Sequence, residues 1–225
     1  MTRGVALALG LALVGCAAAG PLRDPLTADE HNDLGVAYFE RGDARRAALE
    51  FERAVVLRPD WARALVNLGD ARLALGEVGG AIAAYRRAVL IAPGDPEPAN
   101  NLAWALLQDP ARWPEAEPII DAALARRPEP RGYYLDTLGA LRLRKGDNRG
   151  ALDAFRAALA DRALPDGRTR AFVLEHAAEA HARLGNDAAA ARCRVLAEAE
   201  RTKPGSGGAA AVRPIATVGE PGSVC

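Results

Sequence analysis

Side chains that could carry out covalent or metal chemistry are few in this chain of 225 residues. Its three histidines are His31, His176 and His181, and the last two are five residues apart. On a helix this spacing separates the two rings by about 140°, whereas histidines that share a metal ion usually lie four residues apart. The sequence contains no Gly-rich phosphate loop, no His-Glu-x-x-His and no Gly-x-Ser-x-Gly. We therefore predict no catalytic residue, no metal site and no cofactor, and we expect that the protein is not an enzyme.

The chain has three cysteines, at positions 16, 193 and 225. Three are too few for a disulfide framework, so packing must supply the stability of the fold. Cys193 and Cys225 could form a single disulfide in an oxidising compartment, and a free, partly buried Cys193 is equally compatible with the sequence. Both alternatives stay open at this point.

The third cysteine, Cys16, follows a segment with the features of a secretion signal. Residues 1–15 carry one early positive charge, Arg3, and then an apolar run from Val5 to Val14. A run of about ten residues is too short to cross about 30 Å of hydrocarbon, but it fits the apolar core of a signal peptide. The run ends in the sequence Leu-Val-Gly-Cys at positions 13–16.

This ending resembles the bacterial lipobox, in which a peptidase cleaves before a cysteine that becomes acylated. The resemblance implies that residues 1–15 are a lipoprotein signal peptide, that Cys16 is the lipidation site and that residues 16–27 are a tether. In Gram-negative bacteria an aspartate after the lipidated cysteine retains the protein in the inner membrane, and this chain has Ala17 there. The resemblance therefore implies an anchor on the periplasmic face of the outer membrane. An ordinary signal peptide, cut near residues 17–19 with Cys16 incidental, is the alternative.

Downstream of the tether, the sequence repeats itself with a period of 34 residues. Residues of the same type recur at that interval. The matching pairs are Leu34-Gly35 and Leu68-Gly69, Ala47 and Ala81, Phe51 and Tyr85, Ala54 and Ala88, and Pro59 and Pro93. Each unit shows apolar positions at i, i+3, i+4 and i+7 in two segments, which predicts two helices of about 13 residues. The aromatic residue is expected to fill the wedge between helices that a small residue, such as Gly35, allows to approach.

The expected helix ends carry their own signals. Glycines follow the first helix of four units, at Gly42, Gly76, Gly146 and Gly185, where a left-handed conformation is needed. We expect nearby aspartates to cap the second helices, namely Asp43, Asp147 and Asp187. Pro59, Pro93 and Pro128 are expected to end second helices, because proline has no N–H and disfavours the α conformation before it.

The pattern of Leu-Gly, Ala, aromatic, Ala and Pro at fixed offsets resembles the tetratricopeptide repeat. The resemblance implies an all-α fold, a right-handed α-solenoid of about five helix-turn-helix units. The units are expected at 28–61, 62–95, 96–130, 132–165 and 171–203. The third unit has one extra residue in its turn at 108–112, and the fifth is degenerate, with Arg194 in place of the aromatic residue. The Gly- and Pro-containing segment 204–225 is expected to be a flexible tail.

The resemblance also implies where a partner would bind. In tetratricopeptide arrays the first helix of each pair lines a concave groove, and repeat positions 2, 5, 9 and 12 face the ligand. Residues at these positions form the predicted partner-binding groove: Asn32, Val36, Arg63, Val66, Asp70, Asn100, Trp104, Tyr133 and Asp136. Trp104 and Tyr133 would form an aromatic pair suited to anchoring a peptide if they are exposed. The alternative is that Trp104 packs against the irregular third unit.

The balance of charged residues argues against nucleic acid as a partner. The chain has 29 Lys+Arg against 29 Asp+Glu, so its formal net charge is zero and we predict no nucleic-acid partner. The predicted function is that of a lipid-anchored periplasmic scaffold or adaptor that binds envelope proteins or peptides. Similar-looking lipoproteins are assembly factors of pilus or secretion systems. The alternatives are an enzyme or ligand-binding protein with a site in the groove, and a purely structural spacer.

Overall fold

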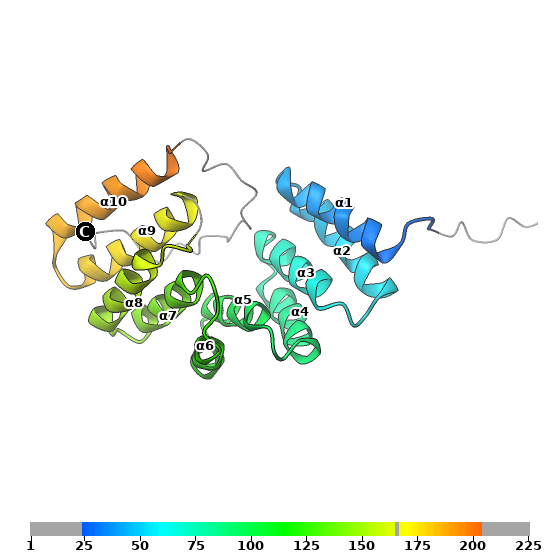
Figure 1. The fold of residues 1–225 in the computed structure, drawn as a ribbon, viewed down its shortest axis with the longest axis horizontal. Coiled ribbons are helices and arrows are strands. Elements are labelled where there is room, and N and C mark those ends of the chain that lie inside the picture. Colours follow the sequence, from blue (N-terminus) through cyan, green and yellow to red (C-terminus); the bar gives the residue numbers. More distant parts are fainter. Residues whose placement is uncertain (1–23, 165–166, 204–225) are drawn as a thin grey trace, which may run out of the picture.

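The computed structural model describes residues 24–164 and 167–203, and within them the chain forms helices and turns without a strand (Figure 1). The α-helices of the described residues are α1 (Ala28–Glu40), α2 (Ala44–Leu57), α3 (Ala62–Ala74), α4 (Val78–Ile91), α5 (Pro96–Leu107), α6 (Ala116–Ala125), α7 (Gly132–Arg144), α8 (Asn148–Ala160), α9 (Gly167–Arg183) and α10 (Asp187–Arg201). A short 3-10 helix, η1 (Trp113–Glu115), precedes α6. The predicted all-α fold is confirmed.

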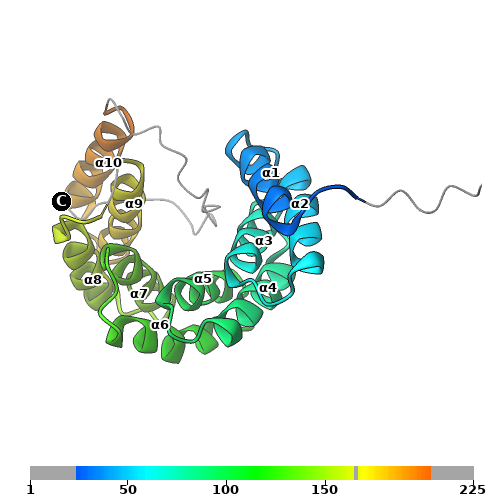
Figure 2. The same cartoon turned by 45° about the vertical axis from the view of Figure 1, so that its right-hand side comes forward.

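Consecutive helices pack as pairs, and the pairs stack side by side into an arc (Figure 2). The odd-numbered helices lie on the inner side of the arc, where α1, α3, α5, α7 and α9 each contact the next in the series. The even-numbered helices lie on the outer side. This arrangement is the predicted α-solenoid, in which stacking of neighbouring pairs supplies the apolar core.

The ends of the helices follow the sequence signals, with one exception. The four predicted turn glycines adopt φ angles between 75° and 79° at Gly42, Gly76, Gly146 and Gly185. The carboxylates of Asp43 and Asp147 accept hydrogen bonds from backbone N–H groups in the first turns of α2 and α8. The expected capping role of Asp187 is wrong, because α10 already includes Asp187 and its N-cap residue is Asn186.

Aromatic rings fill the wedges between helices at the positions that the repeat predicts. Phe51 is 1% exposed, and a Cβ atom placed on Gly35 would lie 2.6 Å from its ring. The same close approach joins Gly69 to Tyr85, where the distance would be 2.4 Å. A glycine is required at these positions because any side chain would occupy the space of the ring.

The third and fifth units depart from the regular pattern. In the third unit, residues 108–112 form a longer turn that leads into η1, and α6 has 10 residues where α2 has 14. In the fifth unit, α9 begins at Gly167, before the expected start at 171, and Gly167 lies close to the backbone of Glu200. The predicted signal peptide, Cys16 and the tail 204–225 lie outside the described residues. No helix of the described part is long and apolar enough to span a bilayer.

Candidate interaction surface

The inner helices carry all nine residues of the predicted groove. These residues differ in how much of each side chain is exposed to solvent. Those that reach solvent are Val36, Asp70 and Tyr133, which are half-buried, and Arg63, which is exposed. Those with little contact to solvent are Asn32, Val66, Asn100, Trp104 and Asp136. The second group lies beneath the surface that a partner would touch. A role in partner binding stays a prediction for all nine.

In the first two units, hydrogen bonds within the array hold two polar side chains of the predicted groove, Asn32 and Asp70. The Asn67 amide donates a hydrogen bond to Asn32 Oδ1 at 2.8 Å and thereby joins α3 to α1. The hydroxyl of Tyr85, the wedge residue of the second unit, donates to Asp70 Oδ1 at 2.6 Å. These side chains hold the inner helices in register, and such fixed placement prepares a surface for binding at low entropic cost.

Trp104 does not offer an exposed aromatic surface. It is 6% exposed, and its ring lies 5.5 Å from the ring of His176 on α9, measured between centroids. Of the two alternatives for Trp104, the exposed one does not apply, and the ring packs within the array against α9 of the fifth unit. The His176 ring also lies 5.9 Å from the Phe155 ring. Of the predicted aromatic pair, Tyr133 alone keeps partial contact with solvent.

The sequence did not reveal the partner of His176. Its Nδ1 atom lies 2.8 Å from Oδ1 of Asp136, a buried residue on α7 and 40 positions earlier in the chain. The repeat register could have found this pair, because position 5 of one unit faces the inner helix of the next. Within residues 24–164 and 167–203, no group of three or more His, Cys, Asp or Glu is placed to hold a metal ion.

One turn beyond His176, Glu179 is a buried carboxyl on the same helix. Burial raises the pKa of Glu179, and the guanidinium of Arg183, which is hydrogen-bonded to it, opposes this effect. On α5, Asn100 Oδ1 is a further buried polar atom, and it is without a hydrogen-bond partner in the described structure. Helices α5, α7 and α9 thus each contribute a buried polar side chain to the inner side of the array.

Glu179 makes the stability of the array depend on pH in a defined direction. Because its pKa is raised in the folded state, the folded protein holds the proton more tightly than the unfolded chain does. The free energy of unfolding of the wild type, relative to that of Glu179→Gln, is expected to fall as the pH rises above 4.5 through the folded pKa. Urea titrations of both proteins at several pH values measure this difference. A difference that does not change with pH would contradict the assignment.

A second buried polar cluster lies at the start of the array. The fully buried ring of His31 contacts Glu50 Oε2 through Nδ1 at 2.7 Å and Asp24 Oδ2 through Nε2 at 3.3 Å. The guanidinium of Arg53 binds the other oxygen of Glu50 at 2.8 Å. The repeat pattern assigns no role to position 31, so the sequence analysis missed this cluster. It attaches residue 24 to the first helix pair.

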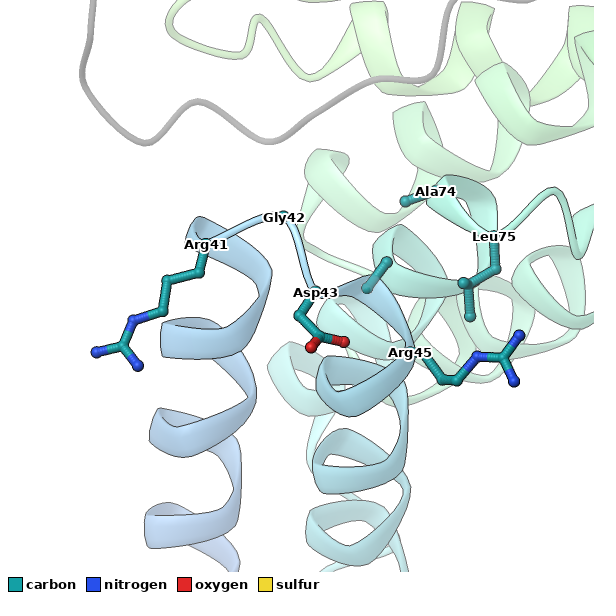
Figure 3. A pocket seen from close by; sticks show the side chains of 7 residues that line it. Arg41, Gly42, Asp43, Arg45, Ala74 and Leu75 are labelled. Atoms are coloured by element: carbon teal, nitrogen blue, oxygen red, sulfur yellow. The ribbon is translucent and has the colours of Figure 1, made fainter.

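The structure also has a shallow hollow of about 470 Å³ away from the concave face (Figure 3). It lies where the turn between α1 and α2 meets the end of α3, and its lining includes Arg41, Asp43, Arg45 and Leu75. The Asp43 carboxylate already caps α2, and the side chains of Arg41 and Arg45 point away from it in opposite directions. We therefore do not regard this hollow as a candidate site.

Cys193 is fully buried on α10 and takes part in a disulfide bond. The other two cysteines, at positions 16 and 225, lie outside the described residues. The specific pairing of Cys193 with Cys225 stays a prediction.

Comparison with known proteins identifies the repeat. Residues 32–96, which span the first two units, match the family model of the tetratricopeptide repeat. The first two units are therefore tetratricopeptide repeats. No curated protein matches it in sequence. Tetratricopeptide repeats generally bind protein partners and are not catalytic.

Solved structures with the same fold share little sequence with this chain. A chain of the APC/C hetero-tetramer Cut9–Hcn1 is 19% identical with a TM-score of 0.67, over 78% of this chain and 33% of that chain. This chain thus spans about a third of that protein. TTC0263, a thermophilic protein of Thermus thermophilus, is 22% identical with a TM-score of 0.57, over 77% and 98%. PilW, a type IV pilus biogenesis factor, is 20% identical with a TM-score of 0.56, over 77% and 91%.

Proposed function

We propose that this protein is a lipid-anchored periplasmic scaffold whose concave face captures a segment of another envelope protein. The observation that supports the proposal most directly is the continuous inner surface made by α1, α3, α5, α7 and α9. Its side chains are mixed in character, with Val36, Arg63, Asp70 and Tyr133 reaching solvent. Such a surface can bind a peptide by shape and by a few polar contacts without covalent chemistry.

The proposed binding surface differs from the set of residues that the repeat register predicts. The buried side chains, among them Asn32 and Asp136, would act by fixing the positions of the inner helices. The residues that reach solvent would contact the partner directly. Among them, Arg63 lies on α3 and Tyr133 lies on α7. An arginine and a tyrosine are the residue types most often found to dominate binding energy at interfaces.

The proposed location rests on the lipobox resemblance at residues 13–16. Acylation of Cys16 would hold the array at the membrane, because two or three acyl chains give stable attachment where one does not. PilW, which shares the fold, is a type IV pilus biogenesis factor. A role as an assembly factor of a pilus or secretion machine is the specific form of the proposal.

Affinity purification from detergent-solubilised membranes tests both parts of the proposal. The wild type is expected to retain one or more envelope proteins, and Arg63→Glu/Tyr133→Ala is expected to lose at least about nine tenths of them, since each interface residue of this kind contributes more than about 1 kcal/mol. Arg149→Glu, an exposed residue on α8 at the outer side, is the matched control and should keep the same partners. Cys16→Ser is expected to abolish labelling with palmitate and to move the protein out of the membrane fraction.

Each result decides one part of the proposal. If the groove variant keeps the same partners as the wild type, the concave face is not the binding surface. If the wild type retains no partner, the chain is a spacer or binds a small ligand. If Cys16→Ser stays in the membrane without palmitate, the lipid anchor is wrong.

A further inference from the structure

The first two helix pairs expose aliphatic side chains on their outer side. Val56 and Leu57 at the end of α2 are 77% and 54% exposed, and Leu90 and Ile91 at the end of α4 are 80% and 38% exposed. We call these four residues the apolar edge. The two pairs are 34 residues apart and therefore occupy the same positions of neighbouring repeats.

The repeat fold itself does not require aliphatic residues at these positions. In the third unit the corresponding residues are Ala125 and Arg126, and in the fourth they are Ala160 and Asp161. Helices α6 and α8 end there with small or charged residues and pack as the others do. Aliphatic side chains exposed to this degree gain nothing from packing within the chain, so a contiguous group of them indicates contact with another surface.

Two contacts place the apolar edge next to the point where the chain enters α1. The Arg87 guanidinium on α4 donates to the Pro59 carbonyl just beyond α2 at 3.1 Å, so the ends of α2 and α4 are neighbours. The Arg58 guanidinium, directly after Leu57, donates to Asp29 in the first turn of α1 at 3.2 Å. Figure 1 shows that the chain enters α1 at the end where α2 leads into α3.

The length of chain before α1 limits how far this edge can lie from a membrane. Asp24 follows Cys16 by eight positions, and a fully extended chain over that distance reaches at most about 28 Å. The Asp24 carboxylate contacts the buried His31 ring, so the residues after Asp24 do not lengthen the tether. A lipid on Cys16 would therefore keep the apolar edge within reach of the bilayer surface at all times.

We propose that the apolar edge rests on the phospholipid surface and inserts its four aliphatic side chains among the headgroups. The proposal depends on the proposed lipid anchor for its physiological setting. Aliphatic residues bordered by arginine and tryptophan are typical of segments that lie in a membrane interface. Here Arg53 and Arg87 lie one turn before the aliphatic pairs, and the Arg58 guanidinium stacks over the half-buried Trp61 at 4.3 Å.

The charges around the edge define the kind of contact. Asp29 is paired with Arg58, Glu50 is paired with Arg53, and Asp60 is exposed nearby. Because acidic residues offset the charge of these arginines, electrostatic attraction to anionic lipid contributes little. The attraction to the membrane comes from insertion of the aliphatic side chains, and a high density of anionic lipid is not required. Weak insertion is sufficient, since the anchor already holds the edge at a high effective concentration near the bilayer. The contact would fix the rotation of the array about its tether.

Binding of residues 17–225 to lipid vesicles tests the edge without the anchor. This segment keeps the whole array, because the three apolar clusters lie within the described residues. It should sediment with vesicles of phosphatidylethanolamine and phosphatidylglycerol at about 5 mM lipid, where weak interfacial partition is measurable. Val56→Ser/Leu90→Ser is expected to lower the partition coefficient about tenfold, as removal of two inserted aliphatic side chains implies. Val195→Ser/Leu196→Ser, an exposed apolar pair on α10, is the matched control and should leave it unchanged.

Three results would overturn the proposal. The first is that the unsubstituted segment does not sediment with vesicles, and the second is that both double variants weaken binding equally. The third is a dimer in sedimentation velocity that only Val56→Ser/Leu90→Ser dissociates, because a second copy would then cover the edge. Palmitate labelling of the full chain is scored separately, so vesicle binding without labelling refutes the anchor and leaves the edge supported.

Discussion

Replacement of Phe51 by alanine is expected to lower the free energy of unfolding by about 3–5 kcal/mol, the range for a buried phenylalanine. The ring is 1% exposed and occupies the space that Gly35 leaves between α1 and α2. Its removal leaves a cavity that the helices cannot close, because both are also packed against α3. A urea titration followed by circular dichroism measures the loss.

The matched control for this prediction lies on the same helix. Leu49 is 52% exposed, so Leu49→Ala removes a side chain of α2 with little change in packing and should cost less than about 1 kcal/mol. An unchanged stability of Phe51→Ala would mean that the repeat register is wrong. Equal losses in the two variants would mean that helix propensity, and not the wedge, accounts for the effect.

The regular part of the fold could be predicted because its causes are local and repeated. Gly42 must adopt a positive φ to end α1, and Asp43 can cap α2 from the next position along the chain. Several of these signals recur in other units, as at Gly76 and Gly146, so a chance match at one position does not alter the prediction. The failure at Asp187 shows the limit of such signals, because the neighbouring Asn186 takes the cap position in α10.

The candidate surface was harder to predict because burial depends on the neighbouring unit. Trp104 occupies a groove position by its own register, yet His176 on α9 covers it from 72 positions downstream. The polar core around His31 is hidden for a related reason. A buried histidine is tolerated at this position because Glu50 is its hydrogen-bond partner and the Asp24 carboxylate lies against its other ring nitrogen.

A substitution at Gly69 is expected to be as damaging as the loss of a core ring. A Cβ atom at Gly69 would lie 2.4 Å from the ring of Tyr85, which is completely buried and donates its hydroxyl to Asp70. Gly69→Val must therefore displace the ring and break this hydrogen bond. Overpacking of about 1–3 kcal/mol and a lost buried hydrogen bond of about 1–3 kcal/mol together predict a loss of roughly 3 kcal/mol or more.

The control for Gly69 is Gly79, a glycine of α4 with open space around the position of a Cβ atom. Gly79→Val should leave the stability unchanged or raise it slightly, because glycine is the poorer helix former. The decisive comparison combines Gly69→Val with Tyr85→Ala. If the clash with the ring is the cause, Gly69→Val should cost close to nothing once Tyr85 is alanine, because the added methyl groups then enter the vacated space. If Gly69→Val lowers the stability equally with Tyr85 and with alanine at position 85, the loss comes from the α3 backbone. That result would refute the clash with the Tyr85 ring as its cause.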